Sequence, residues 1–242
     1  MKERPLPDDF RGLHVLADDD PRWGADPVAV GEAGCRGGAA VIQLRAKRAT
    51  DSQALDWARA LREVTRRHGA RLVVNDRFDL ALAAEADAVH LGQGDLPPAA
   101  LPARARGLLA VGRSTHTLDQ LRAALAEPVD YLAYGPVFGT QSKPSEYSRR
   151  GLEQLAAAAK EMDARPLVAI GGITEENLAA VVEAGADGAA VISAVMGTAD
   201  PEAATHRLVD VIAQALARRV DRYDRHDRYD RYDRDDQGGR HE

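Results

Sequence analysis

The sequence has a single cysteine among its 242 residues, no long hydrophobic run and no excess of positive charge. Cys35 can form no disulfide bond within the chain, and a zinc site built from cysteines is excluded. No apolar run approaches the roughly 18 residues that a membrane-spanning helix needs. Residues 1–12 lack the apolar core of a signal peptide. These absences predict a cytoplasmic protein with no membrane partner.

The charge balance is mildly acidic, with a net charge of −6 at pH 7 and an isoelectric point near 5.7. A nucleic-acid-binding domain needs a basic face, so this balance argues against nucleic acid as a partner. The hydrophobic content of 45% allows a large core. A chain of this length suits one α/β barrel or two small domains.

Short apolar runs alternate with longer amphipathic stretches along most of the chain. Rich in Val, Leu, Ile and Ala, they are typical of parallel strands buried on both faces. The runs are 13–18, 39–45, 70–76, 87–93, 108–114, 129–135, 166–172 and 188–194. Helices are predicted at 51–69 (capped by Asp51 or Ser52 and stopped by Gly69), 151–162 and 174–185. Eight such repeats favour an α/β fold of the (β/α)8 TIM barrel type over a doubly wound sheet.

The domain boundaries follow from composition. Residues 1–11 form an N-terminal extension, and residues 12–219 form a single barrel domain. Residues 220–242 are a low-complexity charged tail, rich in Asp, Arg and Tyr, that has almost no aliphatic side chains. Such a segment cannot bury enough surface to offset the entropy of ordering it. It is expected to be disordered or to extend the last helix, and a weak interaction role for it stays open.

Polar residues gather where the predicted strands end, which is where TIM barrels place their active sites. They are Gln43, Arg45 and Lys47, then Asn75 and Asp76, then Asp95, then Arg113, Ser114, Thr115 and His116. The opposite ends of the strands, such as "HGA" and "EAGADG", have the composition of plain turns. The sequence therefore predicts a site at one end of the barrel.

Two aspartates on adjacent strands predict a metal site. The carboxylates of Asp76 and Asp95 could share one hard cation, and Mg²⁺ accepts two carboxylates together with water and substrate oxygens. The alternative is that both aspartates cap the helices that follow. The metal hypothesis is the stronger for Asp76, which directly follows a strand-terminal Asn75.

Two anionic groups are predicted to bind at this end. Gly171–Gly172 and Ile192–Ser193 end the last two strands, where barrels of this kind commonly bind phosphate through bare backbone N–H groups. Arg45, Lys47 and Lys143 are more cations than one monophosphate needs. A diphosphate neutralised by Mg²⁺ would account for them.

Seven motifs together resemble those of the thiamine-phosphate synthase family in order and spacing. They are "QLRAK", "VND", "HLGQGD", "GRSTHT", "GPVFGTQSK", "AIGGI" and "GADGAAVISA", spread over roughly residues 12–215. The resemblance implies a transferase that joins 4-amino-2-methyl-5-(diphosphooxymethyl)pyrimidine to 4-methyl-5-(2-phosphoethyl)thiazole, with or without a carboxyl group on the thiazole. The products would be thiamine phosphate and diphosphate.

The resemblance also implies a role for each residue of these motifs. Residues expected to hold the pyrimidine diphosphate are Gln43, Leu44, Arg45, Ala46, Lys47, Asn75, Ser114 and Lys143. Residues expected to hold the thiazole phosphate are Thr140, Gln141, Ser142, Gly172, Ile192 and Ser193. Catalytic roles fall to Lys143, Ser114 and Arg45, and Asp76 and Asp95 are expected to hold one Mg²⁺ per subunit.

Some features depart from the family pattern or favour other functions. The family usually has Pro in place of Gly139 and often Thr in place of Ser142, and Glu146 is an unexpected acid in an anion-binding loop. A thiazole tautomerase of the same superfamily would use His116 as a proton shuttle, and a non-catalytic phosphate-binding barrel is a third hypothesis. We expect His116 to be a helix-start residue without a chemical role, and His90 to be a satisfied core histidine.

Overall fold

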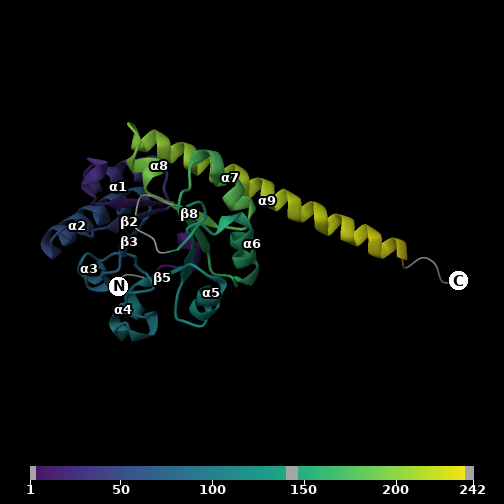
Figure 1. The fold of residues 1–242 in the computed structure, drawn as a ribbon, viewed down its shortest axis with the longest axis horizontal. Helices are drawn as coiled ribbons and strands as arrows, with labels where there is room; N and C mark the ends of the chain where they lie inside the picture. Colours follow the sequence, from purple (N-terminus) through teal and green to yellow (C-terminus); the bar gives the residue numbers. More distant parts are fainter. Residues whose placement is uncertain (1–3, 140–146, 238–242) are drawn as a thin grey trace.

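The computed structural model describes residues 4–139 and 147–237, and only the backbone for 220–237. Eight parallel strands close into a barrel in the order of the sequence (Figure 1). They are β1 (Gly12–Asp18), β2 (Val41–Arg45), β3 (Arg71–Asn75), β4 (Ala88–Leu91), β5 (Ala110–Thr115), β6 (Tyr131–Tyr134), β7 (Leu167–Ile170) and β8 (Gly188–Val191). The prediction of a TIM barrel is confirmed.

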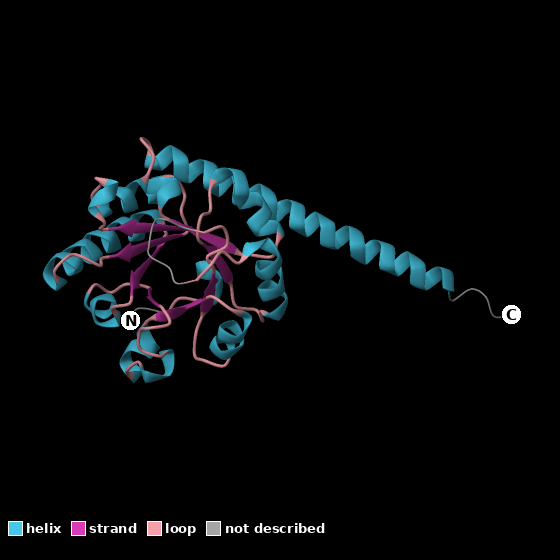
Figure 2. Cartoon of the chain, viewed as in Figure 1, coloured by secondary structure: helices cyan, strands magenta, loops and turns pink. Residues whose placement is uncertain are grey.

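Helices surround the strands, as Figure 2 shows. They are α1 (Pro27–Arg36), α2 (Asp51–His68), α3 (Phe78–Ala83), α4 (Ala103–Leu108), α5 (Leu118–Leu125), α6 (Gly151–Glu161), α7 (Glu175–Glu183), α8 (Ser193–Met196) and α9 (Pro201–Gln237). Three short 3-10 turns, η1 (Pro7–Phe10), η2 (Pro21–Trp23) and η3 (Pro98–Ala100), complete the described elements. No helix in the described part of the chain is long and apolar enough to cross a membrane.

Several predicted element ends were misplaced by up to three residues, those of α2 and β8 among them. The cap of α2 is Thr50, whose hydroxyl accepts a hydrogen bond from the N–H of Gln53 at 3.3 Å, and not Asp51 or Ser52, which lie inside the helix. The C-terminal cap at Gly69 is confirmed by its left-handed backbone (φ 73°). The last apolar run, 188–194, is too long for β8, because Ser193 already begins α8.

The N-terminal segment closes one end of the barrel. Phe10, in η1, is fully buried and stacks on the ring of Tyr131 with centroids 4.8 Å apart. Tyr131 lies inside the barrel, beside Gly112 of the neighbouring strand. Aromatic side chains therefore fill the barrel interior at the end that the N-terminal segment closes, and ligands must enter from the other end.

Three aspartates in equivalent positions connect neighbouring strands by hydrogen bonds at this closed end. Each directly precedes a strand and accepts a hydrogen bond from a backbone N–H at the start of the strand before it. The pairs are Asp87 with Leu72 (2.9 Å), Asp130 with Val111 (2.7 Å) and Asp187 with Leu167 (3.0 Å). Arginines complete them: Arg62 at Asp87, Arg4 at Asp130, and Arg11 and Arg219 at Asp187. The segments expected to be turns are turns, but the ion pairs of this end were not expected from the sequence.

The last helix has two parts. Its first part packs against α1, α7 and α8, and buries Leu208, Ile212 and Ala215. Beyond this part, Figure 1 shows the yellow end of α9 leaving the barrel as a projecting helix. Residues 220–237 thus belong to α9. The sequence alone leaves open whether this tail is disordered or extends the last helix.

Candidate active site

The open end of the barrel holds a small polar cavity of about 30 Å³ among the strands. Gln43, Arg45, Asn75 and Ser114, four residues expected to bind one ligand, line it together with His90. Since they come from β2, β3, β5 and β4, the closure of the barrel is what brings them together.

Arg45 is held in place by a buried aspartate that the sequence interpretation missed. The side chain of Asp18, at the end of β1, is completely buried, and its Oδ2 lies 2.5 Å from Nη1 of Arg45. The Asp18 carboxylate also accepts a hydrogen bond from the N–H of Asp20 at 2.8 Å. A buried charge pair of this kind is costly to break. The guanidinium is therefore fixed before any ligand arrives.

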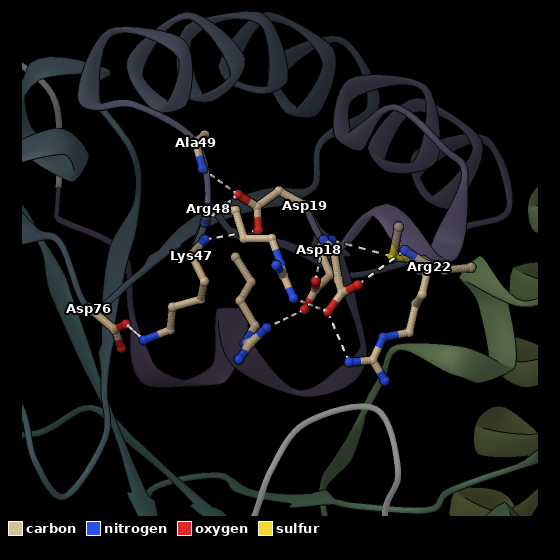
Figure 3. A network of polar contacts seen from close by, with 10 residues as sticks. Asp18, Asp19, Arg22, Lys47, Arg48, Ala49 and Asp76 are labelled. Carbon is tan, nitrogen blue, oxygen red and sulfur yellow. Dashed lines mark hydrogen bonds and ion pairs between the residues drawn. The ribbon is translucent and has the colours of Figure 1, made fainter.

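Asp19 organises the loop that carries Lys47. Its carboxylate accepts hydrogen bonds from three consecutive N–H groups, those of Lys47 (2.9 Å), Arg48 (2.7 Å) and Ala49 (2.8 Å) (Figure 3). The run "ADDD" at residues 17–20 ends the first predicted strand. The rule applied to the other strand ends would therefore have found both Asp18 and Asp19.

The two predicted metal ligands face one another. Burial raises the pKa of Asp76, the ammonium of Lys47 opposes that shift, and the adjoining carboxylate of Asp95 adds to it. Lys47 forms an ion pair with Asp76 (Figure 3). Asp76 has a left-handed backbone (φ 64°), and its N–H donates to the carbonyl oxygen of His90 at 2.8 Å. The carboxyl group is thus aimed by an uncommon backbone conformation.

This pair fits the donor set of Mg²⁺. The described residues contain no group of three or more His, Cys, Asp or Glu side chains able to hold a metal, so a cation here would have two carboxylates as protein ligands. Mg²⁺ is commonly held by one or two carboxylates while it keeps waters and substrate phosphates. Neither aspartate is a helix cap: Arg77 precedes α3, Pro97 precedes η3, and Asp95 accepts from the N–H of Gly92 at 2.6 Å. The capping alternative is wrong.

The predicted phosphate site has two close backbone segments. Gly171 and Gly172 both have left-handed backbones (φ 102° and 66°), and a Cβ at Gly172 would lie 2.2 Å from the carbonyl oxygen of Gly139. Only glycine fits there. Ile192 is buried at the end of β8, and the exposed Ser193 begins α8. Because β7 and β8 are neighbours, the two segments lie at adjoining strand ends.

The remaining predicted site residues are Leu44 and Ala46, at and just after the end of β2, and the residues of the loop after β6. Leu44 is buried in the core and Ala46 packs against it, so any role of these two falls to their backbone groups. Thr140, Gln141, Ser142, Lys143 and Glu146 lie outside the described residues.

His116 and His90, the two histidines considered in the sequence analysis, both have close partners. The ring of His116 lies with Nδ1 2.6 Å from the carbonyl oxygen of Gly135 and stacks on Tyr147 with centroids 3.9 Å apart. His90 is buried, and hydrogen bonds engage both of its ring nitrogens, as expected of a satisfied core histidine. One of those bonds reaches the site residue Ser114, a connection that the sequence did not indicate.

Comparisons with known proteins cover most of the barrel. A family model described as thiamine monophosphate synthase matches residues 13–195. A thiamine-phosphate synthase of Anaeromyxobacter dehalogenans is 48% identical over 200 residues, covering 81% of this chain and 86% of the relative. One of Natronomonas pharaonis is 43% identical over 203 residues, covering 83% and 94%. The solved thiamine phosphate pyrophosphorylase of Pyrococcus furiosus is 35% identical, with a TM-score of 0.77 over 88% of this chain and all of that one.

Proposed function

The chain belongs to the thiamine monophosphate synthase family, and we propose that it makes thiamine phosphate by a magnesium-assisted dissociative substitution. The substrates are the pyrimidine diphosphate and the thiazole phosphate that the sequence motifs imply, and diphosphate is released. The observation that carries the mechanism is the ion pair of Lys47 with Asp76, whose carboxyl group adjoins Asp95, beside the end of β2 where Asp18 holds Arg45. We place the protein in the cytoplasm.

The pyrimidine diphosphate is assigned to the side of β2, β3 and β5. Gln43, Asn75 and Ser114 line the small interior cavity and offer donors and acceptors to the edge of a flat heterocycle bound over it. Arg45 and Lys47 lie closer to the rim and meet the diphosphate. Lys47 is 48% exposed, so its ion pair with Asp76 is cheap to exchange for a ligand contact. Lys143 is assigned to the same group.

Asp76 and Asp95 would hold Mg²⁺ beside this diphosphate. The bound ion supplies positive charge to the departing oxygens. Because burial and the neighbouring carboxylate raise the pKa of Asp76, a cation at this place relieves an unfavourable pair of acids.

The thiazole phosphate is assigned to the ends of β7 and β8. Gly172, Ile192 and Ser193 offer backbone N–H groups there, and Thr140, Gln141 and Ser142 are assigned to the same phosphate. The loop "GTQSK" would then span both anionic groups, with Thr140 to Ser142 on one and Lys143 on the other.

The bond changes balance without a general base. The C–O bond to the diphosphate breaks and its electron pair leaves with the diphosphate. The electron-rich aminopyrimidine stabilises the resulting methylene cation, and the lone pair of the thiazole nitrogen forms the new C–N bond. Such a reaction needs charge stabilisation at the leaving group more than proton transfer. The described side chains suit it, since Arg45 is a cation fixed by Asp18 and Lys47 is a half-exposed cation that can exchange its partner.

The alternative functions have no observation in their favour. A tautomerase would have to move protons through Nε2 of His116, because its Nδ1 is within hydrogen-bond distance of the Gly135 carbonyl and its ring stacks on Tyr147. The relatives described above are named as synthases. A non-catalytic phosphate-binding barrel would have no use for the Asp76–Asp95 pair.

The metal requirement is tested with purified protein and both substrates. Product should form only when both substrates are present, should be abolished by EDTA, and should return when Mg²⁺ is added in excess. Thiamine phosphate formed at an unchanged rate without any divalent metal would contradict the role of Asp76 and Asp95.

The dissociative step is tested at Lys143. Replacing Lys143 by Ala should lower the single-turnover rate by roughly 10²–10³-fold, the scale for losing one preorganised charge-stabilising donor. The Michaelis constant for the thiazole phosphate should hardly change. If only that constant rises and the single-turnover rate is intact, Lys143 is assigned to the wrong anion.

A further inference from the structure

One layer of the barrel interior links three neighbouring strands. His90 of β4 is in register with Gly112 of β5, and Gly112 is in register with Tyr131 of β6. A Cβ at Gly112 would lie 2.1 Å from the Tyr131 ring. The missing side chain of Gly112 therefore lets Tyr131 reach across β5, where its hydroxyl lies 3.0 Å from Nδ1 of His90.

Tyr131 has no freedom to turn away. Its side chain is buried, Phe10 stacks against its ring at an interplanar angle of 15°, and His14 packs against its edge. Burial raises the pKa of Tyr131 well above its usual range, so its hydroxyl keeps its proton. A buried hydroxyl proton needs an acceptor.

The positions of the protons follow from this need. Among the described residues, His90 is the hydrogen-bond partner of the Tyr131 hydroxyl. Tyr131 therefore donates to Nδ1, because the opposite direction would leave its own buried proton without an acceptor among the described residues. A neutral imidazole that accepts at Nδ1 carries its proton on Nε2. Nε2 of His90 lies 2.8 Å from Oγ of Ser114, so His90 donates to Ser114.

We propose that Tyr131 and His90 are positioning residues that turn the Ser114 hydroxyl proton toward the substrate. Because Oγ already accepts from His90, the O–H of Ser114 is left to donate into the cavity that Gln43, Arg45 and Asn75 also line. Its partner is a hydrogen-bond acceptor on the bound pyrimidine diphosphate. This step rests on the proposed function, since that function assigns Ser114 to this substrate.

The direction of the bonds is tested first on the ligand-free protein. Nitrogen-15 NMR of protein labelled at its seven histidines distinguishes the two tautomers of each ring, and a His90→Gln variant identifies the signals of His90. The proton of His90 should be on Nε2. A proton on Nδ1, alone or together with one on Nε2, overturns the proposal. This measurement needs no substrate, so its result stands apart from any failure of the proposed function.

Kinetics then test whether Tyr131 acts through Ser114. Tyr131→Phe keeps the ring and removes only the hydroxyl, and should lower the single-turnover rate by about 3- to 10-fold, the scale of one hydrogen bond. The matched control is Tyr134→Phe on the same strand, because the buried Tyr134 hydroxyl has no hydrogen-bond partner among the described residues. The control should turn over like the unchanged protein.

A double-mutant cycle separates positioning from general damage to the barrel. In a Ser114→Ala background, Tyr131→Phe should cause almost no further loss, because the hydroxyl that it directs is already gone. An equal loss in both backgrounds overturns the proposal, as does a Tyr131→Phe variant with the full single-turnover rate.

Discussion

The two ends of the barrel use the same acidic and basic residue types in opposite ways. At the closed end, Asp87 is bound by the N–H of Leu72 and by Arg62, and its side chain is only 2% exposed. At the open end, the ion-pair partner of Asp76 is Lys47, whose side chain is half exposed. The carboxylate of Asp95 adjoins that of Asp76. One end has its charges matched within the protein. The other keeps charges that a ligand can match.

Strand direction explains this difference. Parallel strands begin with unpaired N–H groups and end with unpaired carbonyl groups. An aspartate just before a strand, such as Asp87, Asp130 or Asp187, therefore meets a donor on its neighbour. An aspartate just after a strand lies next to carbonyl oxygens instead. It must accept hydrogen bonds from a loop, as Asp19 does, or bind a cation. The fold thus places stability at one end and binding at the other.

The largest expected effect is loss of stability at the closed end. Asp87→Ala would leave Arg62 buried without its partner, and it should lower the free energy of unfolding by about 3–5 kcal/mol. Urea unfolding measures this. The matched control is Asp187→Ala, where the carboxylate is 17% exposed and the loss should be smaller. A change below about 1 kcal/mol at Asp87 would show that the two ends do not differ in this way.

The second expected effect is loss of activity at the open end without loss of stability. Asp76→Asn should reduce turnover by roughly 10²–10³-fold, because one charge at the reacting group is removed. The melting temperature should not fall, since Asn tolerates the left-handed backbone of Asp76 and carries no charge to desolvate. Calorimetric titration with Mg²⁺ should show weakened binding. A fall in melting temperature as large as that of Asp87→Ala would erase the contrast.

The sequence predicts strands and site positions through different signals. The apolar runs located all eight strands, since parallel strands buried on both faces leave that pattern. The polar residues after them marked Gln43, Arg45, Asn75 and Ser114, which the barrel does bring together. What could not be predicted depends on register between strands. The reach of Tyr131 across Gly112 to His90 has no signature along the chain, because it joins three separate strands.

The third prediction concerns the closed end as pH falls. His14 is fully buried, with Nε2 2.8 Å from the carbonyl oxygen of Phe10, and burial lowers its pKa to about 4 from the usual 6.5. Between those two values the unfolded chain binds a proton that the folded chain does not. The contribution of His14 to the free energy of unfolding is therefore fully present above pH 6.5. It falls as the pH drops toward 4, by up to roughly 3 kcal/mol.

Urea unfolding between pH 4 and pH 7 measures this loss, and His14→Gln is its control. The variant lacks the titrating ring, so its stability should depend less steeply on pH, whatever its stability at pH 7. Equal slopes for the two proteins would mean that His14 keeps an ordinary pKa in the folded state.

The smallest expected effect lies in α9, where the comparison is between the packed and the projecting parts of one helix. The packed part buries Leu208 and Ile212, and Arg219 donates to the carbonyl oxygens of Val182 (3.2 Å) and Ala186 (2.9 Å). Removing residues 221–242 spares these contacts, and the Asp/Arg/Tyr composition of that segment cannot form a core. Melting temperature and turnover should therefore stay nearly unchanged.

A second truncation gives the matched control for the projecting part. A chain that ends at residue 206 loses the buried side chains of the packed part, and apolar burial of about 25 cal/mol per Å² goes with them. It should melt far earlier than the chain that ends at residue 220. If the shorter removal already lowers the melting temperature or turnover strongly, residues 221–242 have a contact that their composition does not indicate. Because both truncations keep every assigned site residue, a change in turnover without a change in melting temperature would point to the site and not to the core.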